Sequence, residues 1–145
     1  MIIARAVLDD LVEHAWESRP LECCGLLLGN DERIVDSLRA RNLAASPTRY
    51  LVDPADHIRA RRAARARALD VVGFYHSHPK GKATPSPRDI LEASYREALW
   101  VIVGLRDHAA SNDAPGRENA SVRAFRIGEG RASEVALTPE GERNE

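Results

Sequence analysis

The chain has 145 residues, enough for one compact domain with a buried core and too few for two ordinary domains. Its 21 basic residues nearly balance its 22 acidic ones, so the overall charge does not favour nucleic acid or an anionic membrane as the main partner. No apolar run reaches the roughly 18 to 20 residues that a membrane helix needs, and acidic residues interrupt the apolar positions of residues 1–16, unlike in a signal peptide. The adjacent Cys23 and Cys24 exclude a disulfide framework, so we expect a soluble, cytoplasmic protein.

The N-terminal half predicts two helices and several short strands. A strand over residues 2–6 precedes an amphipathic helix over 7–18, where apolar residues recur at helical spacing. Strands over 23–29 and 33–41 flank a Gly-Asn-Asp turn, and a further short strand is expected over 50–52. Asp53 and Pro54 then form a typical helix start, with the helix running to about residue 69. Its five arginines between 59 and 67 are best explained as a solvated face.

The C-terminal half alternates strands and helices. We predict a buried strand over residues 71–75, a helix over 87–97 and a second buried strand over 100–105. A polar loop over 107–120 and closing strands over 121–127 and 132–137 follow. This order predicts an α/β fold with a single mixed β-sheet flanked by helices. The domain should cover residues 1–137, with 138–145 as a polar C-terminal tail.

The segment GFYHSHPKGKATPSPRDI, residues 73–90, contains the pattern with the clearest chemistry. His76 and His78 are two apart, so their imidazoles point to the same side if the backbone stays extended. Ser86 and Asp89 are three apart in the first turn of the next helix, so both can face one region. Two nitrogen donors and one carboxylate, with a fourth position left to water, are typical of a catalytic zinc site.

Each part of this pattern also has an ordinary explanation. Ser-Pro-x-Asp is a common helix start, and the chain has a similar one at residues 53–56, where nothing else indicates a site. Glu22, at the beginning of an apolar strand, is a candidate proton acceptor, but local sequence alone favours an exposed acid. The histidine pair upstream of Ser86 favours the metal site, while the role of Glu22 stays open at this level.

The combined spacing resembles the JAMM signature of MPN-domain metalloproteases, the Mov34/PAD-1 family. The signature comprises Glu22, the segment His76-Ser-His-Pro79, seven residues from Pro79 to Pro85, then Ser86 and Asp89. The short prokaryotic members are the most similar, and further likeness at 20–29, 53–54, 73–75 and 124–127 extends the resemblance over about residues 1–137.

The resemblance implies an MPN/JAMM architecture, related to that of cytidine deaminases, and one Zn²⁺ per chain. The zinc ligands of the family fall on His76, His78 and Asp89. Its general acid/base falls on Glu22, and its oxyanion-stabilising serine falls on Ser86.

The implied function is a zinc metallopeptidase or isopeptidase that hydrolyses the bond after the C-terminal Gly-Gly of a ubiquitin-like or sulfur-carrier protein. The alternative is a catalytically silent MPN scaffold, which lacks the metal ligands that this chain retains. A zinc deaminase is disfavoured because its Pro-Cys-x-x-Cys ligand pair is absent. One departure is Gly104-Leu105, where many eukaryotic relatives have Asp-Pro. Cys24 is expected to pack beside the site, and three histidines without ligand-spaced partners are expected to face solvent: His14, His57 and His108.

Overall fold

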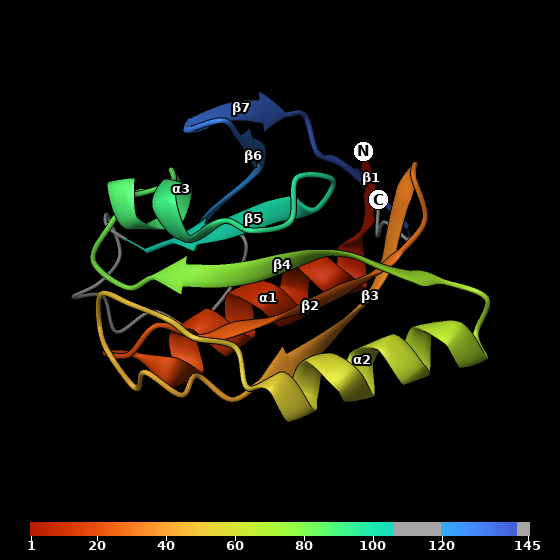
Figure 1. The fold of residues 1–145 in the computed structure, drawn as a ribbon, viewed down its shortest axis with the longest axis horizontal. Helices are drawn as coiled ribbons and strands as arrows, with labels where there is room; N and C mark the ends of the chain where they lie inside the picture. The colour runs from red at the N-terminus through yellow and green to blue at the C-terminus, as the bar shows by residue number, and fades with distance from the viewer. Residues whose placement is uncertain (106–119, 142–145) are drawn as a thin grey trace.

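The computed structural model describes residues 1–105 and 120–141 and contains a mixed sheet with helices on both faces (Figure 1). The predicted loop over 107–120, apart from residue 120, lies outside the described residues, as do His108 and the last four residues of the predicted tail. None of the described helices is long and apolar enough to cross a membrane.

The described strands form one eight-stranded sheet in the order β7-β6-β5-β4-β2-β3-β1-β8. Their bounds are β1 (Ile2–Ala4), β2 (Cys24–Gly29), β3 (Arg33–Ala40), β4 (Asp70–His78), β5 (Leu99–Gly104), β6 (Ser121–Gly128), β7 (Arg131–Val135) and β8 (Thr138–Glu140). β4 runs parallel to β5, and β1 runs parallel to both of its neighbours, whereas the remaining pairs are antiparallel. The predicted mixed sheet is therefore confirmed.

The helices are α1 (Arg5–Ser18), α2 (Pro54–Ala66) and α3 (Pro87–Glu92). α1 covers one face of the sheet, and α2 crosses the other (Figure 1). Side chains alternate between the two faces along each strand. In β4 the Tyr75 side chain joins the core beneath α1, while Phe74 joins the core beneath α2 and α3. From Phe74 onward, the even-numbered residues of β4, including both histidines, therefore point to the α2 and α3 side.

Three elements differ from the sequence prediction because tertiary contacts decide them. α3 ends at Glu92 instead of continuing to 97, and the segment beyond it places the Tyr95 ring against Phe74, with centroids 5.3 Å apart. The expected strand over 50–52 is only an isolated bridge between Asn42 and Val52. Residues 138–140, expected in a loose tail, form β8 along β1. Main-chain pairing needs no apolar side chains, so the polar sequence gave no sign of this strand.

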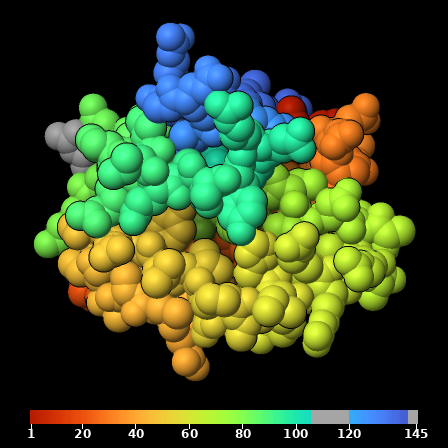
Figure 2. Space-filling view, in the orientation of Figure 1, coloured from red at the N-terminus to blue at the C-terminus, as the bar shows by residue number. Residues whose placement is uncertain are grey.

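Figure 2 shows the outer surface on the α2 side. Residues of the 41–53 loop and of α2 cover its lower half, and residues of α3 and of the segment 93–98 that follows it lie above them. The histidine end of β4 lies toward the side of the molecule where α3 begins (Figure 1).

Candidate metal centre

β4 carries both histidines of the predicted site. Its extended backbone runs through His78, so His76 and His78 lie on the same face, as their spacing requires. β4 is an interior strand: His76 is paired with Cys24 of β2, and His78 is paired with Gly104 of β5. Because hydrogen-bonded strands flank it on both sides, the positions of the two imidazoles along the sheet are fixed.

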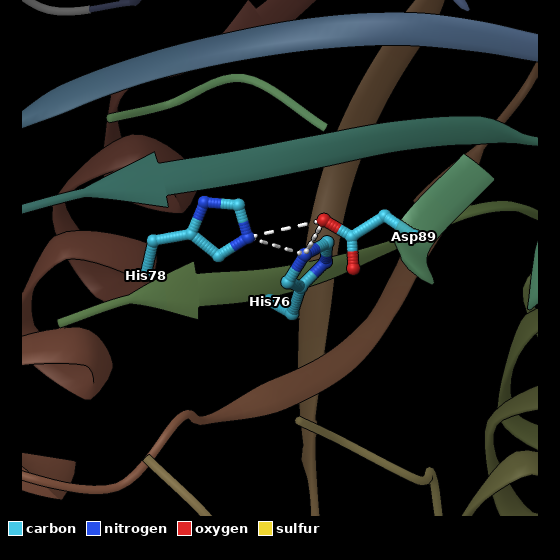
Figure 3. A group of neighbouring side chains, drawn as sticks. All are labelled: His76, His78 and Asp89. Carbon is cyan, nitrogen blue, oxygen red and sulfur yellow. Dashed lines mark hydrogen bonds and ion pairs between the residues drawn. The ribbon is translucent and has the colours of Figure 1, made fainter. Parts of the chain in front are cut away.

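The donor atoms of His76, His78 and Asp89 form a nearly equilateral triangle (Figure 3). Nε2 of His76 lies 3.2 Å from Nε2 of His78, and each of these nitrogens lies 3.1 Å from Oδ2 of Asp89. Zinc–ligand bonds of about 2.0–2.1 Å at tetrahedral angles put neighbouring donors about 3.3 Å apart. The three side chains form a group that could hold one metal ion, and its spacing suits three corners of a tetrahedron.

Asp89 reaches the triangle from the first turn of α3. Ser86 is the N-cap of this helix: its Oγ accepts a hydrogen bond from the Asp89 N–H, and Asp89 Oδ2 accepts one from the Ser86 N–H. The ordinary capping explanation is therefore correct, and the same carboxylate also faces the histidines. In the similar start of α2, the Asp56 carboxylate instead accepts from the Arg41 N–H and pairs with Arg59.

The two imidazoles are oriented by different contacts. Nδ1 of His78 lies 2.8 Å from the Lys82 carbonyl, an outer-shell bond of the kind that orients metal-binding histidines. Gly104 allows the Lys82–Ala83 backbone to come this close, because a Cβ at Gly104 would lie 2.4 Å from the Ala83 nitrogen. This glycine belongs to the Gly104-Leu105 pair that was noted in the sequence as a departure from the eukaryotic pattern.

His76 is held by an aromatic ring. The Tyr50 ring stacks on its imidazole, with centroids 4.2 Å apart and planes 19° apart. Within the described part of the chain, His76 Nδ1 is buried without a hydrogen-bond partner. Tyr50 was not predicted as a site residue, since a contact between residues this far apart in sequence leaves no local pattern.

Charge and burial act together on these groups. Burial opposes ionisation of Asp89, but hydrogen bonds from both histidines and from the Ser86 N–H hold the pKa of its carboxyl well below the usual range. Burial lowers the pKa of His76. Burial acts in the same direction on His78, but the bonds to Asp89 and the Lys82 carbonyl outweigh it and raise the pKa of His78. The Asp89 carboxylate therefore stays ionised beside two imidazoles in a largely buried position.

Glu22 is buried, contrary to what its local sequence favoured. Its side chain is 5 % exposed, and Oε1 has no hydrogen-bond partner among the described residues. Burial raises the pKa of Glu22 to about 8, which the charge of His78 opposes and that of Asp89 reinforces. Glu22 thus interacts with the triangle without belonging to it. A buried acid with a free oxygen beside a metal-binding group can accept and return a proton.

Ser77, which lies between the two histidines, links β4 to the start of β2 through hydrogen bonds with Cys23. The Ser77 side chain points to the opposite face from the histidines, where its Oγ accepts a hydrogen bond from the Cys23 N–H over 2.9 Å. The Ser77 N–H in turn donates to the Cys23 carbonyl. Burial raises the pKa of both cysteines to about 12, so neither offers a thiolate at neutral pH. The Cys24 thiol lies 3.7 Å from the Arg41 carbonyl, in agreement with the packing role expected for it.

Two histidines outside the site were predicted to face solvent, but both are partly buried. His14 is half-buried on α1, with Nδ1 2.7 Å from the hydroxyl of the buried Tyr75. His57 packs edge-on against Phe74 and Tyr95. Both make aromatic contacts with residues distant in sequence, so the absence of ligand spacing does not imply exposure.

Two shallow hollows on the described surface are not lined by the ligands of the triangle. One lies against Trp16, Pro20 and Pro79, and the other lies between α3 and the turn after β6. Pro79, in the wall of the first hollow, directly follows His78, and Pro87, in the wall of the second, directly follows Ser86.

Comparison with known families supports the resemblance noted in the sequence. Residues 4–127 match the family described as prokaryotic homologs of the JAB domain, and the chain belongs to this family. Similar solved structures include a protein from Desulfitobacterium hafniense, 24% identical, with a TM-score of 0.84 over 98% of this chain and 94% of that one. A JAB1/MPN domain protein from Archaeoglobus fulgidus, 19% identical, has a TM-score of 0.60 over 97% of each chain. These likenesses concern the fold, and the predicted MPN/JAMM architecture is confirmed.

Three curated relatives have names that describe an activity. A probable TtuB-protein conjugate cleaving protease from Thermus thermophilus is 36% identical over 94% of this chain and 81% of its own length. A desampylase from Haloferax volcanii is 32% identical over 76% of this chain and 84% of its own. A CysO-cysteine peptidase from Mycobacterium tuberculosis is 30% identical over 92% of this chain and 87% of its own.

Proposed function

We propose that the protein is a zinc-dependent peptidase or isopeptidase that hydrolyses the bond after the C-terminal Gly-Gly of a ubiquitin-like or sulfur-carrier protein. The observation that carries this proposal is the triangle of His76, His78 and Asp89 with the buried Glu22 beside it. The names of the relatives support the reaction class, because they include a conjugate cleaving protease and a peptidase.

Zinc suits this donor set. His76 and His78 would supply neutral nitrogens and Asp89 a carboxylate oxygen, which leaves one position open, as in catalytic zinc sites. A zinc ion held there would supply a Lewis acid for the scissile carbonyl and lower the pKa of a bound water toward neutral. The mutual spacing of 3.1–3.2 Å supports a single small ion.

Two further residues carry the chemistry of the chain itself. Glu22 takes the proton of the attacking water on its unpartnered oxygen and later gives it to the leaving amine. The Ser86 hydroxyl donates a hydrogen bond to the oxyanion, and it is free to do so because its oxygen accepts from the Asp89 N–H and its own hydrogen is unused in the cap.

A Gly-Gly tail fits a site of this kind for a physical reason. An extended segment without side chains can pass between close walls where larger residues would collide, and its peptide groups can bind along exposed backbone. Discrimination then depends on the folded body of the carrier, so a short tail peptide should be a far poorer substrate. The silent-scaffold alternative is not favoured, since the donor set and Glu22 are all present. A cytoplasmic location remains a prediction, consistent with two buried free cysteines.

The test uses the zinc-loaded protein and a folded carrier conjugate, with the products identified by mass. We expect cleavage after the terminal glycine, little cleavage when that glycine is replaced by valine, and loss of most activity in Glu22→Gln with zinc content unchanged. Equal cleavage of unfolded casein and of the valine variant would refute the carrier specificity. Near-normal turnover by Glu22→Gln would remove Glu22 from the mechanism.

A further inference from the structure

We propose that Asn42 is a positioning residue that holds Glu22, and the loop carrying Tyr50, in place beside the metal-binding triangle. The role in hydrolysis rests on the proposed function, whereas the structural link between Asn42 and Glu22 can be tested in metal-free protein. Asn42 follows β3 and contributes no donor to the triangle.

The Asn42 side chain makes four hydrogen bonds. Its Nδ2 donates to the Glu22 carbonyl and to the Arg49 carbonyl, each over 3.1 Å. Its Oδ1 accepts from the Ala44 N–H over 3.0 Å and from the Leu51 N–H over 2.9 Å. Two carbonyls on one side and two N–H groups on the other fix the orientation of the amide. Both of its donors and both lone pairs are used, so the amide is fully satisfied.

Backbone hydrogen bonds also hold the 41–53 loop, at its two ends and at its middle. Backbone bonds join Leu43 to Leu51 and Asp53 to Arg41, which closes the base of the loop. From the middle of the loop, the Ser46 carbonyl accepts the Glu22 N–H over 2.9 Å. The backbone of Glu22 is thus hydrogen-bonded on both sides of its Cα. Its N–H donates to the Ser46 carbonyl of the loop, and its carbonyl accepts from the Asn42 side chain.

The same loop brings an aromatic ring to a ligand. Tyr50 lies between Arg49 and Leu51, whose backbone groups both bond to Asn42, and its ring stacks on His76. One amide therefore connects the candidate base with the ring that packs on a metal ligand. A small displacement of a reacting group can cost about 10²-fold in rate. Asn42 can therefore affect the rate of hydrolysis through the position of Glu22, without contact with substrate.

No other small side chain reproduces this pattern. Aspartate keeps the acceptor for Ala44 and Leu51 but turns an oxygen toward the Glu22 and Arg49 carbonyls, where a donor is needed. Alanine removes both halves. Asn42→Asp therefore removes the bonds to the Glu22 and Arg49 carbonyls but keeps the acceptor for Ala44 and Leu51, and Asn42→Ala removes all four bonds.

The chain offers a matched control at the other end of β2. Asn30 also accepts two backbone N–H groups in a turn, from Glu32 and Arg33, each over 3.0 Å. Asn30→Ala removes these two acceptor bonds, the same kind that Asn42 Oδ1 makes, at an exposed turn at the far end of β2 from Glu22. Melting temperatures of all variants show whether any loss reflects general instability.

The first measurement is amide hydrogen exchange in the metal-free protein. The Glu22 N–H bonds to Ser46 and not to Asn42, so faster exchange there in both Asn42 variants would show that Asn42 acts through the loop. We also expect Asn42→Ala to shift the His76 ring protons in NMR spectra as the Tyr50 stack loosens. Unchanged protection of the Glu22 N–H in both variants would overturn the proposal.

The second measurement is hydrolysis by the zinc-loaded variants. We expect both Asn42 variants to bind zinc at the parent stoichiometry and to lose about 10-fold to 100-fold in kcat with little change in KM. Asn30→Ala should stay within about 2-fold of the parent. Parent-like kcat in both Asn42 variants, or an equal loss in Asn30→Ala, would refute the positioning role. If the parent hydrolyses no carrier conjugate but Glu22 protection is lost as expected, the link stands and the proposed function fails.

Discussion

Ser86 and Asp89 bond to each other in both directions. The Ser86 N–H donates to Asp89 Oδ2 over 2.9 Å, and the Asp89 N–H donates to Ser86 Oγ over 3.0 Å. The same Oδ2 is one corner of the triangle with His76 and His78. A single capping box thus starts α3 and places a candidate metal ligand, so the two roles cannot be altered independently.

Replacing Ser86 should lower both the stability of the fold and the rate of hydrolysis. Ser86→Ala should lower the free energy of unfolding by about 1 kcal/mol through loss of the cap, and lower kcat by about 10²-fold to 10³-fold through loss of an oxyanion donor. Asp53→Ala is the matched control, because Asp53 caps α2 through the Ala55 N–H without approaching the triangle. Denaturation curves and initial rates for both variants test this, and equal rate losses in the two would count against a role for the Ser86 hydroxyl.

A methyl group at Gly104 should weaken metal binding without touching a ligand. Its Cβ would lie 2.4 Å from the Ala83 nitrogen and 2.7 Å from the Lys82 carbonyl carbon, so the loop must move away from His78 Nδ1. Gly104→Ala should reduce zinc affinity by about 10-fold to 100-fold, as loss of other outer-shell partners does. In Gly128→Ala the nearest atoms are 3.9 Å away on the flexible Arg96 side chain, so its affinity should match the parent. Competition with a chelating dye measures both; parent-like affinity in Gly104→Ala would contradict the account.

Zinc binding should release a proton from Glu22. Burial raises the pKa of Glu22 to about 8 in the metal-free protein, so its carboxyl is mainly protonated at pH 7. A nearby doubly charged cation favours the carboxylate. Titration calorimetry at pH 7, in buffers with different ionisation enthalpies, should give about one more proton released by the parent than by Glu22→Gln. Identical proton counts would mean that Glu22 does not sense the metal.

His14 should make the fold less stable in acid. Burial, aided by Arg39, lowers the pKa of His14 to about 4, below the roughly 6.5 of an unfolded histidine. Between these values the unfolded chain binds a proton that the folded chain does not, so stability is full above about pH 6.5 and is lost as the pH falls toward 4. Because His14 is only half-buried, the loss attributable to it should be on the order of 1 kcal/mol. The difference between parent and His14→Gln in urea unfolding at pH 7 and pH 4.5 isolates this contribution; no pH dependence in that difference would refute it.

The predictable part of the site lies where local pattern and geometry coincide. His76 and His78 were placed correctly because an extended strand fixes the direction of alternate side chains. The start of α3 was predictable because a capping serine, a proline and an acid mark helix starts. The burial of Glu22 was not predictable from its sequence neighbours, since it depends on β4 and on the 41–53 loop. Only the resemblance to the family signature indicated that Glu22 belongs to the site.

The contacts that orient the site were missed for the same physical reason. Asn42 and Gly104 each act through backbone groups that the fold brings close from other segments. Nothing in the residues around them marks such a contact. β8 was missed because its pairing with β1 uses main-chain bonds and exposed polar side chains. Long-range packing therefore decides the details that local sequence leaves open.

The central claim is that His76, His78 and Asp89 together hold one zinc ion. Crystals of the zinc-loaded protein, measured at the zinc absorption edge, test it most directly by anomalous diffraction. We expect one strong peak per chain, about 2.0–2.1 Å from both Nε2 atoms and from Asp89 Oδ2, and no such peak in crystals of His78→Ala grown in the same zinc concentration. A peak elsewhere, or no peak between these three side chains in the parent, would contradict the account.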